Sequence, residues 1–194
     1  MKGSLRVIGG NARGMRLKTV PGDTTRPITD IVKEALFNIL GSEILENNIL
    51  DLFGGTGAVG IEALSRGAKF VTFLDKSQQA IQTIHSNLAT TRFTGQAKVI
   101  RADAFTFLVT NTGAYDLIYI APPQYKEMWQ RAMTLIDGRP KLLTEDGQII
   151  VQINPIEWVE KTYLNLREFD RRKYGDTLLV FFERSAPDSH EQLI

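Results

Sequence analysis

The sequence contains no cysteine and only two histidines, His85 and His190. Without cysteine the chain forms no disulfide, no thiolate metal site and no cysteine nucleophile. So few histidines argue against a hydrolase triad or a histidine-based metal site, and we expect no metal. No apolar run approaches the roughly 20 residues that cross a bilayer, and the opening residues MKGSLRVIGGNARG lack the apolar core of a signal peptide. The sequence therefore predicts a cytoplasmic protein.

The net charge of +1 hides an asymmetry along the 194 residues. Residues 1–33 carry seven basic and two acidic side chains, a net +5, whereas the remainder carries 16 basic and 20 acidic ones, a net −4. A basic segment on a mildly acidic body is typical of a nucleic-acid-binding arm. A solvated face that happens to be basic is the alternative. The predicted RNA-binding side chains are Arg6, Arg13, Arg16 and Arg26.

Two elements are predicted before residue 48. The segments SLRVIGG and MRLKTV flank the glycine-rich GGNARG, which predicts a short β-hairpin. A helix follows in TRPITDIVKEALFNIL, with Asp30 as its N-cap and its end before Gly41. The apolar residues at helical spacing, which should form its buried face, are Ile28, Val32, Ala35, Leu36 and Ile39.

Strands and helices then alternate along the chain. The predicted strands are 48–53, 69–75, 97–103, 115–121 and 147–154, and the predicted helices are 57–66, 77–89, 104–109 and 125–136. Such alternation is typical of a parallel sheet that helices cover on both faces. Residues 166–184 predict two strands joined at Tyr174–Gly175, and therefore an antiparallel edge. The fold class is α/β, a mostly parallel sheet with a small N-terminal β-hairpin.

The segment DLFGGTGAVGIEAL leads from a strand into a helix, and Gly55 to Gly60 match the nucleotide-binding pattern G-x-G-x-x-G. Glycines that merely make a tight turn are the alternative. Asp51 precedes the glycines, where a carboxylate would repel a pyrophosphate but could accept hydrogen bonds from the amino-acid end of S-adenosylmethionine. This position therefore favours S-adenosylmethionine over a dinucleotide.

Two more aspartates end the following strands. Asp75 can accept both hydroxyls of a ribose, which suits NAD equally well. Asp103 lies where a carboxylate or the neighbouring backbone can contact an adenine edge, although a single aspartate at a strand end is usually a helix cap. Three such positions at successive strand ends predict one ligand crevice above the carboxyl edge of the sheet.

The stretch IAPPQYK ends the predicted strand 115–121 at the same edge. Its two prolines fix φ and donate no N–H, so the strand end is rigid and its carbonyls are free to accept hydrogen bonds. A proline-rich strand exit without chemistry is the alternative.

Together these segments resemble the RsmD family of small-subunit ribosomal RNA guanine-N2 methyltransferases, within the class I S-adenosylmethionine-dependent enzymes. The resemblance covers about residues 4–184 and rests on RVIGGNARGMRL, TRPITDIVKEALFNIL, DLFGGTGAVGIEALSRGA, FLDKS and YGDT. It implies a Rossmann-like domain over residues 28–185, preceded by a basic hairpin arm over 1–27. We expect residues 186–194 to be a disordered tail. Nothing in the sequence requires more than a monomer.

The resemblance implies S-adenosylmethionine as cofactor, and rRNA or a partly assembled small ribosomal subunit as partner. The predicted cofactor-binding residues are Thr29, Asp51, Phe53, Gly55, Gly57, Asp75, Lys76, Asp103 and Ala104. The predicted catalytic residues, which we call the acceptor corner, are Ala121, Pro122, Pro123, Gln124 and Tyr125.

The acceptor corner departs from the family's pattern of Asp or Asn, two prolines, then Phe or Tyr, because Ala121 stands in the first position and Gln124 in the last. In enzymes of this kind the acidic or amide side chain and a proline carbonyl accept hydrogen bonds from an exocyclic amine, and the aromatic ring stacks on the flipped base. Loss of one such acceptor should cost about 1–3 kcal/mol. We hypothesise that the Gln124 amide oxygen replaces it and that Tyr125 stacks.

Other functions remain open from the sequence. An exocyclic amine of adenine or cytosine, in RNA or DNA, is an alternative target. A non-catalytic RNA-binding or assembly protein is favoured by Ala121 and opposed by the intact glycine-rich segment. An NAD-dependent oxidoreductase is opposed by Asp51.

Overall fold

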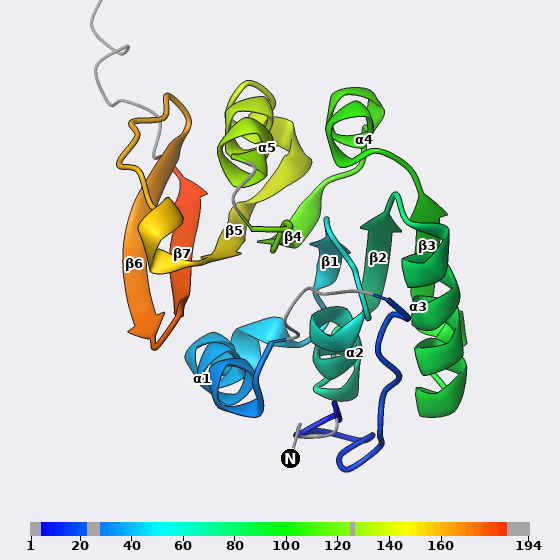
Figure 1. Ribbon diagram of the computed structural model, residues 1–194. Helices are drawn as coiled ribbons and strands as arrows, with labels where there is room; N and C mark the ends of the chain where they lie inside the picture. Colours follow the sequence, from blue (N-terminus) through cyan, green and yellow to red (C-terminus); the bar gives the residue numbers. More distant parts are fainter. Residues whose placement is uncertain (1–4, 23–27, 125–126, 186–194) are drawn as a thin grey trace, which may run out of the picture.

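The computed structural model describes residues 5–22, 28–124 and 127–185. The predictions for Arg26, Tyr125 and the tail 186–194 lie outside these ranges. Within the described residues, seven strands form one sheet in the order β3-β2-β1-β4-β5-β7-β6 (Figure 1). The strands are β1 (Asn48–Asp51), β2 (Phe70–Asp75), β3 (Ala97–Arg101), β4 (Tyr115–Ile120), β5 (Leu143–Ile153), β6 (Leu166–Tyr174) and β7 (Thr177–Arg184).

The pairing of these strands confirms the predicted mostly parallel sheet with an antiparallel edge. Strands β1 to β5 pair in parallel, whereas β7 pairs antiparallel with both β5 and β6. The β6–β7 turn lies at Gly175, whose φ of 56° is in the left-handed region, as the predicted junction at Tyr174–Gly175 requires. We call the edge at which β1 to β5 end the carboxyl edge.

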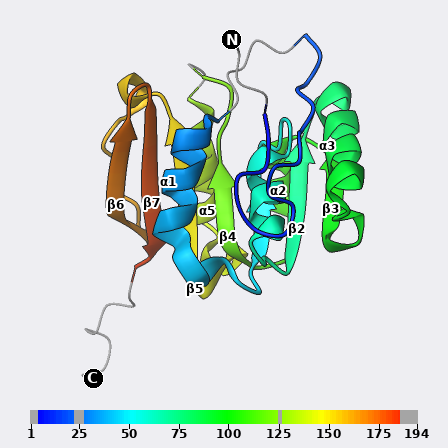
Figure 2. The ribbon, with the colours of Figure 1, turned by 90° about the horizontal axis from the view of Figure 1, so that it is seen from below.

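Helices cover both faces of the sheet (Figures 1 and 2). They are α1 (Asp30–Leu40), α2 (Ala58–Ser65), α3 (Gln78–Thr91), α4 (Ala104–Thr110) and α5 (Met128–Asp137), with 3-10 turns at Gly41–Ile44, Thr94–Gln96, Pro140–Leu142 and Pro155–Glu157. One hydrophobic cluster lies beneath α1, α2 and α3, and a second beneath α4 and α5. None of the helices in the described ranges is long and apolar enough to cross a membrane.

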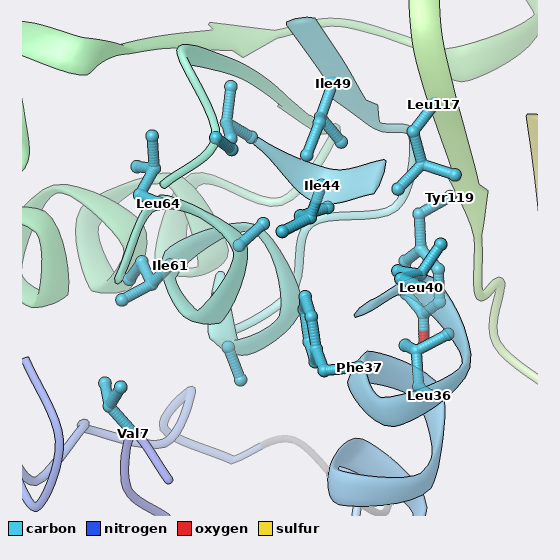
Figure 3. Packing of buried hydrophobic residues seen from close by; sticks show 14 of the residues in the cluster. Val7, Leu36, Phe37, Leu40, Ile44, Ile49, Ile61, Leu64, Leu117 and Tyr119 are labelled. Carbon is cyan, nitrogen blue, oxygen red and sulfur yellow. The ribbon is translucent and has the colours of Figure 1, made fainter. Parts of the chain in front are cut away.

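Strand β1 contributes side chains to both hydrophobic clusters. Its side chains alternate between the two faces, so that Ile49 joins the first cluster and Leu50 the second. In the first cluster, Val7 from the N-terminal segment, Ile61 of α2 and Phe37 of α1 all lie on the same side of β1 (Figure 3). The N-terminal segment is therefore packed into the core of the domain.

The predicted N-cap of α1 was wrong, and its predicted buried face was right at Val32 and Leu36 but wrong at Ile39. Thr29, not Asp30, caps the helix, because the Thr29 hydroxyl accepts the Val32 N–H at 3.3 Å. The predicted apolar residue Ile39 is 39% exposed, whereas Lys33 is fully buried. The buried face consists of Val32, Lys33, Leu36, Phe37 and Leu40. Hydrophobic spacing misplaced part of the face because Lys33 turns toward a buried acidic partner on another helix.

That partner is Glu62 of α2, which is also fully buried. The Lys33 ammonium lies 3.2 Å from one carboxylate oxygen of Glu62, and the Arg66 guanidinium lies 2.9 Å from the other. The backbone N–H groups of Ile8 and Gly9 donate to the same carboxylate at 2.9 and 2.7 Å. A buried charge is tolerated only when it is paired and hydrogen-bonded, so Glu62 holds α1 and the N-terminal segment against α2.

The described part of the N-terminal arm, residues 5–22, contains the predicted hairpin in a short form. Arg6 and Arg16 are partners in one antiparallel bridge, and Leu17 donates its N–H to the Leu5 carbonyl at 2.8 Å. The turn of the hairpin packs against the end of α2, where Asn11 donates its N–H to the Ser65 carbonyl at 2.7 Å. The arm thus lies beside α2 (Figures 1 and 2). Its division from the domain at residue 27 stays a prediction.

Candidate cofactor and base-binding site

The glycine loop (residues 53–57) connects β1 to α2 in a tight turn. The Gly54 N–H donates to the Leu74 carbonyl and the Gly57 N–H to the Gly54 carbonyl, both at 2.7 Å. Gly57, the N-cap of α2, has a φ of 77°, which an L side chain rarely adopts. A Cβ on Gly54 would lie 2.9 Å from Ile84, whereas a Cβ on Gly55 would meet no atom nearer than 3.9 Å. The loop is closely packed at Gly54 and open at Gly55, as a loop that cradles a ligand must be.

Asp75, at the end of β2, is fixed by backbone N–H groups from the glycine loop and from the residue that caps α3. One carboxylate oxygen accepts the Gly55 N–H at 2.9 Å, and the other accepts the Ser77 N–H at 2.8 Å. The side chain is only half-buried. Because each carboxylate oxygen has a second lone pair, Asp75 can accept two further hydrogen bonds. The pair of hydroxyls on a ribose supplies two donors at a suitable spacing.

Asp51 ends β1 in a different environment. It is 2% exposed and accepts a hydrogen bond from the Gly60 backbone in the first turn of α2. Burial is the largest cause that raises the pKa of the Asp51 carboxyl, and the negative charge of Asp75 also raises it, whereas the Gly60 hydrogen bond lowers it. Together these effects give a pKa of about 7. A buried carboxyl that is partly ionised at neutral pH is stabilised by a nearby cation, such as the ammonium of an amino acid, and destabilised by a pyrophosphate.

Asp103 is the N-cap of α4. One of its oxygens accepts the N–H groups of Phe105 and Thr106 at 3.1 and 3.0 Å. The Thr106 N–H bond is the largest cause that lowers the pKa of this carboxyl. The structure therefore gives Asp103 the usual role of a strand-end aspartate, and its contact with an adenine stays a prediction. Ala104, which follows Asp103 as the first residue of α4, is buried.

An aromatic pair lies beside these acids. The rings of Phe53 and Phe105 have centroids 6.5 Å apart in an edge-to-face arrangement, and the Arg131 guanidinium lies 4.0 Å from the centre of the Phe105 ring. Phe105 is buried, so in this pair the half-buried Phe53 is the ring that can offer apolar surface to a flat heterocycle. The remaining predicted cofactor residues, Thr29 and Lys76, are exposed. Thr29 caps α1, and no contact in the described residues joins either one to the glycine loop.

The acceptor corner follows β4, the neighbour of β1. Asp51 is aligned with Tyr119 in the β1–β4 register, so Ala121 lies two residues beyond Asp51 at the same edge. Ala121 packs against the first hydrophobic cluster, Pro122 and Pro123 are half-buried, and Gln124 is exposed. The fold thus brings the acceptor corner next to Asp51 and the glycine loop, while Tyr125 lies outside the described residues.

The predicted RNA-binding arginines are not at this crevice. Arg6, Arg13 and Arg16 are exposed on the arm, which lies beside α2 rather than above the strand ends (Figure 2). The Arg6 guanidinium lies 3.0 Å from the Asp30 carboxylate at the start of α1. A separate cavity of about 600 Å³ lies at the opposite edge of the sheet, where it is lined by Asp116 near the start of β4, and it is not part of the site.

Comparison with known proteins identifies the family. The family described as "Conserved hypothetical protein 95" matches residues 5–183. The chain is 34% identical over 143 residues to ribosomal RNA small subunit methyltransferase D of Escherichia coli strain K12, which covers 74% of this chain and 72% of that protein. The chain belongs to the RsmD family. It is also 37% identical over 183 residues to YlbH of Bacillus subtilis strain 168, across 93% of this chain and 99% of that one.

The fold of this RsmD-family protein agrees with that of a solved relative. The structure of yhhF from Escherichia coli is 30% identical and superposes with a TM-score of 0.83, over 95% of this chain and 100% of that one. The resemblance and the Rossmann-like fold expected from the sequence are therefore confirmed.

Sequence reasoning missed three fully buried polar side chains: Lys33 and Glu62, which join α1 and the arm to α2, and Asn87, which bonds to the glycine loop. Each lies on the apolar stripe of its helix, and a polar residue at such a position was the available signal. Phe105 was also missed, although it directly follows the predicted Ala104. Among the described residues, no group of three or more His, Cys, Asp or Glu side chains could hold a metal.

Proposed function

We propose that this chain transfers a methyl group from S-adenosylmethionine to the exocyclic N2 of a guanine in small-subunit rRNA. The observation that carries the proposal is the alignment of Asp51 with Tyr119, because it places the acceptor corner beside the glycine loop on one edge of the sheet. Membership of the RsmD family supports the reaction, since the Escherichia coli relative is named as a small-subunit rRNA methyltransferase. The described residues also fit the cofactor.

The fit is specific at three positions. Asp75 has two acceptor positions left for the ribose hydroxyls, Gly55 leaves open space at the loop, and the buried Asp51 suits the ammonium of the amino-acid part. The half-buried Phe53 offers apolar surface to the adenine, and the buried Phe105 supports the Phe53 ring edge-to-face. When bound, the cofactor supplies a methyl group carried on a sulfonium sulfur.

The acceptor corner orients the amine. The Pro122 carbonyl and the Gln124 amide oxygen would accept hydrogen bonds from its two N–H groups, which keeps the nitrogen lone pair out of conjugation with the ring and available to the methyl group. The sulfonium sulfur would leave as the thioether of S-adenosylhomocysteine, and the nitrogen would release one proton to solvent. Ala121 offers no side-chain acceptor, so Gln124 provides the second one. The protein contributes position and electrostatics rather than a covalent step.

The arm binds phosphates. Arg6 and Arg16 are directly opposite each other in the antiparallel bridge, so their side chains leave the same face of the hairpin. The Arg6 guanidinium is already paired with Asp30 at 3.0 Å, so a phosphate on this face would add a second anionic partner for the two arginines. Arg13 lies in the turn between them. RNA binding should therefore weaken steeply as salt rises. We place this activity in the cytoplasm, on rRNA or a partly assembled subunit.

The test is mass spectrometry of nucleosides from small-subunit rRNA of cells with and without this gene. We expect N2-methylguanosine to fall by one residue per subunit, and purified protein with S-adenosylmethionine to restore it. A loss of a methylated adenosine or cytidine instead would keep the methyltransferase and replace the base. No change in any nucleoside would contradict the proposal.

A second candidate is a non-catalytic RNA-binding protein, which Ala121 favours because this position has lost its side-chain acceptor. It predicts that S-adenosylhomocysteine raises the melting temperature and that RNA binds, while purified protein transfers no methyl group to rRNA. An NAD-binding protein would instead be stabilised by NAD and not by S-adenosylhomocysteine.

A further inference from the structure

Asn87 of α3 connects the arm to the glycine loop. Its amide nitrogen donates to the carbonyls of Lys18 in the arm at 3.0 Å and of Thr56 in the loop at 2.8 Å. Its amide oxygen accepts the Lys18 N–H at 2.8 Å. The side chain is fully buried, and the two N–H donors and the oxygen are all used.

No other described side chain bonds to both segments. Glu62 fixes Ile8 and Gly9 of the arm to the middle of α2, but neither bond reaches the loop. At Asn87, one planar amide holds a residue from each segment. A displacement of Lys18 must therefore move Thr56 or leave a buried polar group unpaired. Thr56 lies between Gly55 and Gly57, whose backbone we propose to bind the cofactor.

We propose that Asn87 is a positioning residue that couples RNA binding by the arm to cofactor binding by the glycine loop. The inference rests on the proposed function and adds that each ligand strengthens the binding of the other. RNA that holds the arm fixes Lys18, and through Asn87 it fixes Thr56 before the cofactor arrives. The loop backbone that we propose to bind the cofactor is then held from the side of the arm as well. By linkage, the cofactor must strengthen RNA binding by the same factor.

The experiment measures binding of S-adenosylhomocysteine to the full chain by calorimetry, with and without unmodified small-subunit rRNA transcribed in vitro. For the natural sequence we expect the RNA to tighten binding about 5-fold, within the usual range of coupling between sites. For Asn87→Leu, which keeps the size but has no polar atoms, we expect binding without RNA to weaken about 10-fold and the effect of RNA to disappear. Asn87→Asp keeps the acceptor for Lys18 and loses both donated bonds, so it should lose the same effect.

Thr91→Val is the matched control. Thr91 is buried one turn further along α3, and its hydroxyl donates only to the helix carbonyls of Asn87 and Leu88. This variant should lose some thermal stability, yet RNA should still tighten binding about 5-fold. A loss of coupling in Thr91→Val equal to that in Asn87→Leu would show that general weakening of α3 explains the result, and would overturn the proposal.

Hydrogen exchange gives a readout that needs neither turnover nor a variant. RNA binding to the natural sequence should slow exchange at the amides of Gly55 and Gly57, whose N–H groups bond to Asp75 and to the Gly54 carbonyl. If the protein methylates rRNA but RNA changes neither this exchange nor the affinity for S-adenosylhomocysteine, the coupling is refuted and the proposed function stands. If the protein binds neither RNA nor S-adenosylhomocysteine, both are refuted.

Discussion

The carboxyl edge of the sheet has two halves that are built differently. In the cofactor half, Asp51 and the glycine loop come from the end of β1 and Asp75 from the end of β2, and backbone hydrogen bonds fix each acid. In the acceptor half, four consecutive residues follow one strand, and Gln124 is exposed with no side-chain bond among the described residues. The first half is a network across the fold, whereas the second is a short local segment.

This difference predicts different consequences of mutation. A change in the cofactor half should alter stability as well as ligand affinity, because the same hydrogen bonds serve both. A change in the acceptor half should alter rate alone, because its side chains contribute little to the fold. Three predictions follow from this contrast, in order of the expected size of their effects.

Asp51→Asn should stabilise the protein and weaken cofactor binding. Folding raises the pKa of Asp51 from 3.8 to about 7, so between these values the folded state binds more protons than the unfolded state. The contribution of Asp51 to stability is therefore lost as pH rises through this window. Asparagine cannot ionise, and it can still accept the Gly60 N–H. We expect no difference in the free energy of unfolding near pH 4, and a gain that approaches about 4 kcal/mol above pH 7.

Urea denaturation at pH 4, 6 and 8 measures this gain, and calorimetry with S-adenosylhomocysteine measures the affinity. The affinity should fall at pH 8, because the asparagine has no charge for the ammonium. A variant that at pH 8 is no more stable than the natural sequence would refute our account of Asp51.

Asp75→Ala should weaken binding of S-adenosylhomocysteine about 100-fold, because two hydrogen bonds to a carboxylate and the anchor of the Gly55 N–H are lost together. The matched control is Asp116→Ala. Asp116 accepts three bonds, from the Asn48 backbone N–H at 2.8 Å, the Asn48 side-chain amide at 3.4 Å and the Thr144 hydroxyl at 3.0 Å, but at the opposite edge of the sheet. Asp116→Ala should lower the stability of the protein without weakening S-adenosylhomocysteine binding. Equal losses of affinity in both variants would show that Asp75 has no special role in binding.

Gln124→Ala should lower kcat on rRNA about 10-fold, equivalent to about 1.4 kcal/mol, and leave stability and S-adenosylhomocysteine affinity unchanged. Adding Ala121→Asn in that background should restore the rate, because it returns an acceptor to the first position of the corner. Gln96→Ala removes an equally exposed glutamine before β3 and should change nothing. Unchanged turnover in Gln124→Ala would remove Gln124 from the site.

Much of this architecture was predictable because its causes are local. Alternating strand and helix patterns predicted the parallel sheet and the positions of its helices. Glycines after β1 predicted the tight turn that Gly57 makes at a φ of 77°. Acids at successive strand ends predicted a shared edge, because parallel strands end on the same side.

The errors have one physical cause. On α1, the apolar pattern placed Ile39 inside and gave no reason to bury Lys33. The sequence around Lys33 contains no sign of Glu62, which lies 29 positions later and supplies the charge that makes burial tolerable. Asn87 is a similar case, since both of its partners belong to other segments.

By itself, the sequence determined the order of the elements, the tight glycine turn and the edge at which the acids gather, since these follow from backbone preferences and hydrophobic spacing within short segments. Only the tertiary structure decided which polar groups lie inside. A buried charge or amide is stable only if its partners are there to meet it, and the partners of Lys33 and Asn87 come from parts of the chain that folding brings together.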